Sequence, residues 1–69
     1  MRYAIVIEEA GGNYSAYAPD LPGCVATGAS VEQTERKMRE AVAFHLKGLR
    51  EDEVDPPPAS THVEYAEAS

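Results

Sequence analysis

The chain has 69 residues, with one cysteine, two histidines and a formal net charge of −6 at pH 7. A chain of this length forms one domain that buries only roughly 60% of the surface its unfolded form exposes, and a lone cysteine excludes an internal disulfide. Because the two distant histidines and one cysteine offer no zinc-type ligand set, we expect association with another chain to supply the missing stability.

The negative charge is concentrated toward the C-terminus. Residues 1–50 carry six acidic and six basic side chains, whereas residues 51–69 carry six acidic and no basic ones. An acidic end favours basic partners over nucleic acid, or simply keeps the chain soluble. No apolar run approaches the roughly 18 residues of a membrane span, and residues 1–3 begin a strand pattern rather than a signal peptide. We therefore expect a cytoplasmic protein.

Three strand-like runs come first in the chain. Residues 3–8 are rich in β-branched and aromatic side chains, residues 10–13 (AGGN) predict a hairpin turn, and residues 14–18 return as a second strand. A third strand is expected at residues 24–29. Gly28, near the end of that strand, indicates a bulge or a close approach of two backbones.

A helix follows the third strand. Ser30 and Gln33 form a capping-box pattern, which predicts a helix from about residue 31 to about residue 50. One apolar stripe follows helical spacing, and Phe44 and Leu46 flank it. The stripe consists of Val31, Thr34, Met38, Ala41, Val42, His45 and Leu49.

The remaining residues predict a connector and a short fourth strand. Residues 51–61 form an acidic, proline-rich connector, whose three consecutive prolines make a stiff spacer. Residues 62–66 alternate polar and apolar side chains, so we expect a strand with Val63 and Tyr65 facing inward.

These elements predict a single domain over residues 1–69 with an α+β fold in the order β-β-β-α-β. A three-stranded antiparallel sheet carries one helix on one face, and the short fourth strand returns to the sheet. One helix cannot cover both faces, yet residues 3–8 are apolar on both sides. We therefore expect the second face to be covered in one of two ways. The chain forms a homo-oligomer, which is a dimer or larger, or it binds a different protein.

Residues 19–24 (PDLPGC) form the most distinctive motif, a rigid corner between the second and third strands. Pro19 and Pro22 fix φ, and Gly23 frees the backbone where the path bends again, so the corner should carry Leu21 outwards as an apolar anchor. The residues predicted to bind a partner are Tyr17, Pro19, Asp20, Leu21 and Pro22. The residues predicted to shape the loop are Gly23, Cys24 and Gly28.

Few residues suggest catalysis. Cys24 is a candidate nucleophile, but His45 and His62 lack a neighbouring group to orient them, so a buried structural cysteine is favoured. Three carboxylates could converge on a metal, although the middle of the first strand is apolar. Those carboxylates are Glu8, Glu9 and Asp20. We predict no catalytic residue, no metal and no cofactor.

The order of these features resembles the HicB-like antitoxin family over residues 1 to about 60. The resemblance rests on Tyr14-x-Ala16, residues 19–24, Val25-x-Thr27-Gly28, residues 39–42 (REAV), His45-Leu46 and the acidic, proline-rich exit. It implies a trimmed ribonuclease-H-like fold, bacterial in origin, whose last strand returns beside the first. It also implies an antitoxin that binds and silences a small basic RNA-cleaving toxin of the HicA type, and no enzymatic activity.

DNA binding is not expected. The DNA-binding segment of many HicB proteins would begin where this chain stops, and glutamates interrupt the basic residues of the helix. A second hypothesis stays open beside the antitoxin role. It is a stand-alone homo-oligomeric domain with an unknown ligand or a weak catalytic role around Cys24.

Overall fold

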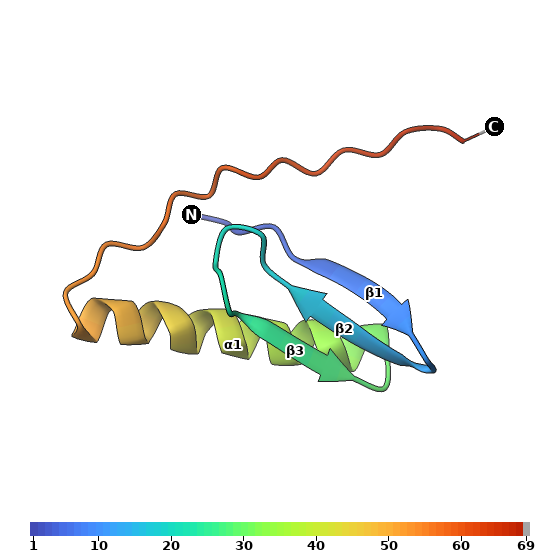
Figure 1. The fold of residues 1–69 in the computed structure, drawn as a ribbon, viewed down its shortest axis with the longest axis horizontal. Helices are drawn as coiled ribbons and strands as arrows, with labels where there is room; N and C mark the ends of the chain where they lie inside the picture. The colour runs from blue at the N-terminus through green and yellow to red at the C-terminus, as the bar shows by residue number, and fades with distance from the viewer. Residues whose placement is uncertain (69) are drawn as a thin grey trace.

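Three strands and one helix follow one another along the chain, and the computed structural model describes residues 1–68. They are β1 (Val6–Ala10), β2 (Asn13–Tyr17), β3 (Val25–Gly28) and α1 (Val31–Glu51). The strands form an antiparallel sheet in the order β1-β2-β3, and α1 lies against one face of it (Figure 1). The predicted α+β fold, a three-stranded antiparallel sheet with one helix, is confirmed.

A two-residue turn fixes the register of the first hairpin. Gly11 and Gly12 have φ angles of 59° and 86°, and positive φ at both positions is the requirement of a type I′ turn. Pairing begins with Ala10 opposite Asn13 and ends with Val6 opposite Tyr17. Strand β1 therefore starts later than predicted, because residues 3–5 have no partner across the hairpin once β2 ends.

The register also decides which side chains face the helix. Ile7, Ala16 and Ala26 lie directly opposite one another across the three strands and pack in or against the core. The neighbouring rows point to the open face of the sheet. One of these rows is apolar and consists of Val6, Tyr17 and Val25, and the other is polar and consists of Glu8, Ser15 and Thr27. The uncovered face is therefore apolar near the loop that follows β2 and polar toward the hairpin turn.

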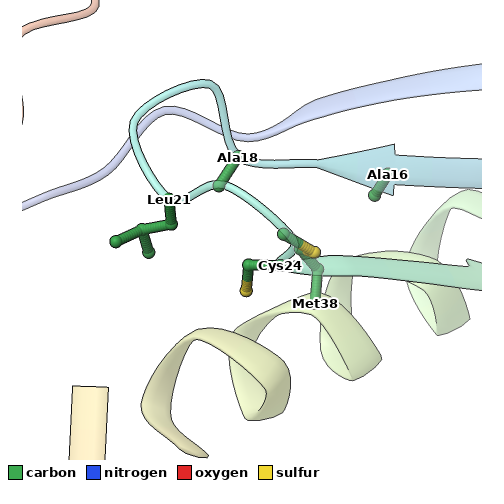
Figure 2. Packing of buried hydrophobic residues seen from close by; sticks show 5 residues of the cluster. All are labelled: Ala16, Ala18, Leu21, Cys24 and Met38. Atoms are coloured by element: carbon green, nitrogen blue, oxygen red, sulfur yellow. The ribbon is translucent and has the colours of Figure 1, made fainter. Parts of the chain in front are cut away.

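The buried core is small and lies where that loop meets the helix. Its hydrophobic members are Ala16, Ala18, Leu21, Cys24 and Met38. Figure 2 shows Ala16 on β2, then Ala18, Leu21 and Cys24 along the loop, with Met38 on α1. Most of the core is therefore supplied by the loop between β2 and β3 rather than by the strands themselves.

Helix α1 begins and ends close to the predicted positions. The Ser30 hydroxyl accepts a hydrogen bond from the Gln33 amide at 3.1 Å, and the Gln33 side chain accepts one from the Ala29 amide at 2.7 Å. These bonds satisfy two amides at the helix start that lack helical partners. At the other end, the last helical residue is Glu51, and Glu53 has a φ of 57°, which turns the chain away.

The fourth strand predicted at residues 62–66 is not formed. Within the described residues, 54–68 contain no strand, and Val63 and Tyr65 are 54% and 93% exposed instead of inward. Residues 61–63 face residues 2–4 across a hollow of about 420 Å³, and the chain then runs beyond the β1 edge of the sheet (Figure 1). Three prolines cannot donate to a strand ladder, and the residues after them are held by the loop, so the segment passes the sheet without pairing.

Candidate protein-interaction site

The loop formed by residues 18–24 is built from two consecutive tight turns. The Leu21 amide donates to the Ala18 carbonyl at 3.1 Å, and the Cys24 amide donates to the Leu21 carbonyl at 3.1 Å. In the second turn Pro22 precedes Gly23, whose φ of 82° matches a type II turn. A further bond of 3.3 Å from the Ala18 amide to the Cys24 carbonyl closes the loop at its base. The predicted rigid corner is therefore present.

Leu21 does not point outwards. Its exposed fraction is 0%, and it packs in the core with Ala18, Cys24 and Met38 (Figure 2). The expectation of an exposed apolar anchor at Leu21 is wrong, because two successive turns fold the tip of the loop back onto α1, where it packs in the same core as Met38. Leu21 instead fixes the loop to the body.

Asp20 is engaged by the chain's own C-terminal segment. Its carboxylate accepts hydrogen bonds from the Thr61 amide at 2.9 Å, the Thr61 hydroxyl at 2.8 Å and the Ser60 hydroxyl at 3.2 Å. The Thr61 amide, followed by the Thr61 hydroxyl, holds the pKa of Asp20 below its ordinary value of 3.8. These bonds favour the charged form, so Asp20 is an anionic anchor for residues 60–61 at neutral pH.

The other predicted partner-binding residues lie on the surface. Pro19 and Pro22 are exposed at the loop, and Tyr17 is exposed at the end of β2 on the open face of the sheet. Val25 lies directly opposite Tyr17 and continues this exposed apolar surface. Loop and open face thus meet at one edge of the molecule, and the predicted role of these residues in binding stays a prediction.

Cys24 and Gly28 are buried or crowded by the fold. Burial raises the pKa of the Cys24 thiol, which disfavours the thiolate that a nucleophile needs. A Cβ on Gly28 would lie 2.5 Å from the Thr34 hydroxyl oxygen, which confirms a close approach of β3 to α1. Both residues therefore act in packing.

No group of three or more metal-ligating side chains occurs among residues 1–68. Glu8 and Glu9 are exposed on β1, whereas Asp20 lies in the loop beyond β2. The part of the chain that the structure describes also contains no helix long and apolar enough to cross a membrane.

Two features of this site carried no clear signal in the sequence. The clasp between Asp20 and Thr61 joins residues that are 41 positions apart, and no local pattern predicts it. An apolar groove between β3 and α1, with Phe44 beside it, was also missed. The helical spacing of Phe44 did place it at the flank of the buried stripe, so its exposure could have been inferred.

Comparison with known proteins identifies the family of this chain. A family model described as the HicB-like antitoxin of a bacterial toxin-antitoxin system matches residues 3–69. The chain belongs to the HicB-like antitoxin family. Two curated relatives are similar to this HicB-like chain, and no solved structure matches it significantly.

The two relatives differ in length. A 14.9 kDa protein of Haemophilus phage HP1 is 32% identical over 65 residues, which are 94% of this chain and 49% of the phage protein. A UPF0150 protein of Helicobacter pylori is 41% identical over 49 residues, which are 71% of this chain and 68% of that protein. The HicB-like chain therefore spans about half the length of the phage protein.

Proposed function

We propose that this chain is an antitoxin module that binds a small, basic, RNA-cleaving toxin of the HicA type and masks it. The observation that carries the proposal is the family match over residues 3–69. In this proposal the chain acts in the cytoplasm, performs no catalysis and binds no DNA directly. Its partners are the toxin and a second copy of itself.

The toxin-binding surface in this proposal is the loop with the adjoining open face. A loop closed by three backbone hydrogen bonds and fixed by buried Leu21 loses little conformational freedom on binding, which favours affinity. Tyr17 supplies an aromatic side chain on this surface and lies between Val6 and Val25 in the sheet, two residues before Pro19. Exposed tyrosines are frequent among the residues that dominate binding energy.

The acidic end of the chain supports the choice of a basic partner. Residues 51–69 carry six acidic and no basic side chains, and residues 60–61 are held beside the loop by Asp20. Negative charge close to the binding surface steers a basic protein toward it and raises the association rate at low salt.

The test is co-expression of this chain with a small basic RNA-cleaving protein of the HicA type, followed by affinity purification and titration. The Tyr17→Ala variant should weaken toxin binding by roughly 30-fold, which corresponds to about 2 kcal/mol. Tyr65→Ala is the matched control, since Tyr65 is an exposed tyrosine of the C-terminal segment. Purification of the wild-type chain without any basic partner, or equal affinity of the Tyr17 variant and the wild type, would contradict the proposal.

A further inference from the structure

A groove of about 410 Å³ runs between the start of β3 and the C-terminal half of α1. Cys24 and Val25 line it on the sheet side, and the helix contributes Ala41, Phe44 and Gly48. Phe44 is 80% exposed, so a large apolar side chain borders the groove in contact with water, whereas the Val25 side chain points to the open face of the sheet. A single exposed apolar side chain is common on a surface, but one that stands beside an apolar groove indicates a contact site.

The groove lies beside a free strand edge that carries no protection. The order β1-β2-β3 leaves β3 unpaired on its outer side. Its four residues (VATG) include no charged side chain and no proline, whereas the opposite edge, β1, carries Glu8 and Glu9. Because charges on an edge strand prevent further pairing, β1 is protected and β3 is available for pairing.

The helix surface at the groove carries a projecting side chain and, one turn later, an open position that could receive such a side chain. Phe44 projects from α1, and a Cβ placed on Gly48 would meet nothing within 4 Å. A projecting side chain next to an open glycine on the same helix fits a second, antiparallel copy of that helix, with each Phe44 over the other Gly48. A smaller hollow of about 110 Å³ beside Phe44 is bordered by Lys47 and Glu51, whose opposite charges suit a two-fold contact.

The strand and helix contacts are compatible with one two-fold axis. Helix α1 packs mainly against β3 and β2. Strands pair about 4.8 Å apart, and helices pack about 8–10 Å apart. Pairing β3 with its copy therefore brings the two helices side by side beneath a continuous sheet.

The chain as a whole exposes more surface than a compact monomer of its mass. A compact monomer of 7.5 kDa exposes about 4,250 Å², whereas this chain exposes 5402 Å². The excess exceeds the roughly 800 Å² that each partner buries in a standard interface. Part of this excess belongs to the extended residues 54–68, so an exchange of that segment between copies is the alternative to be tested.

We propose that two copies of the chain associate through the outer edge of β3 and the Phe44–Gly48 surface of α1. This proposal rests on the self-association included in the proposed function, and it names the surface responsible. It leaves the open face of the sheet and the loop free for a toxin.

The test is sedimentation equilibrium of the full chain at micromolar concentrations, with folding checked by circular dichroism. The wild type should be a dimer, and Phe44→Gln should raise the dissociation constant at least 100-fold. Gly48→Gln should have the same effect while raising the thermal midpoint of the monomer, because the new side chain has free space and glutamine favours helix. Tyr65→Gln is the control for exchange of the C-terminal segment and should leave the dimer intact.

Each other outcome overturns the proposal in a distinguishable way. A monomeric wild type removes self-association altogether, while toxin binding is measured separately. A wild-type dimer that survives both Phe44→Gln and Gly48→Gln contradicts the proposed surface but keeps self-association. A dimer dissociated by Tyr65→Gln alone assigns the contact to the C-terminal segment.

Discussion

Gly28 lets β3 approach α1 closely at Thr34, because glycine has no Cβ to meet the helix. Thr34 is fully buried, and its hydroxyl donates to the Ser30 carbonyl at 2.7 Å. The Thr34 hydroxyl oxygen and amide nitrogen lie 2.5 Å and 3.0 Å from the place where a Cβ on Gly28 would be. A methyl group at residue 28 must therefore push the first turn of the helix away from the sheet.

We expect Gly28→Ala to lower the free energy of unfolding by about 1–3 kcal/mol, because it overpacks this contact. Urea denaturation followed by circular dichroism measures the effect. Thr34→Ala removes the nearest atom, so the double variant should lose less stability than the sum of the two single variants. Additive losses would show that the clash with the Thr34 side chain is not the cause.

At the scale of the elements, the connection between the loop and residues 60–61 depends on one carboxylate. Asp20 is the acceptor of all three hydrogen bonds in this clasp. Its pKa is lowered in the folded chain, so the charged form stabilises the clasp. The contribution is complete above the unfolded value of 3.8 and is lost as the pH falls through the lower folded value.

We therefore expect the amide resonance of Thr61 to shift in an NMR titration with a midpoint below pH 3.8. Asp20→Ala should abolish this transition and speed the hydrogen exchange of the Thr61 amide at neutral pH. Asp55→Ala, which removes a carboxylate elsewhere in the same segment, should change neither. A Thr61 transition that persists in the Asp20 variant would assign the shift to another group.

The elements that the sequence predicted well are those determined by neighbouring residues. The capping pattern of Ser30 and Gln33 fixed the start of α1, and the two glycines of the hairpin marked the turn. Strand β1 was misplaced because its limits depend on where β2 ends. The pattern of residues 62–66 predicted a strand, but alternation alone does not supply a partner, and residues 60–61 are held by Asp20.

In the site, too, the features determined by neighbouring residues were predicted, and those determined by distant residues were not. The bend at residues 19–24 followed from proline and glycine, whose preferences are local. The direction predicted for the Leu21 side chain was wrong, because its burial depends on the position of α1 beneath the loop. The buried core has few hydrophobic members, so burying Leu21 stabilises the fold more than exposing it would.

The whole molecule consists of a compact body and an extended C-terminal segment. Its radius of gyration is 13.4 Å, compared with about 11 Å for a compact chain of this length. The segment is attached at two places, where the Tyr3 hydroxyl donates to the Pro57 carbonyl at 2.5 Å and where Asp20 binds residues 60–61. Among the residues described, Thr61 is the last that hydrogen-bonds to the body.

Deletion of residues 62–69 should therefore change the free energy of unfolding by no more than about 0.5 kcal/mol, as expected for exposed positions. Deletion from residue 56 onward should cost more, since it also removes the Tyr3–Pro57 bond, which contributes about 1 kcal/mol. Thermal and urea unfolding measure both effects. If β3 and Phe44 form the dimer contact, the shorter deletion also stays dimeric in sedimentation. A large loss of stability or of the dimer on removing residues 62–69 would mean that this segment completes the fold or the interface.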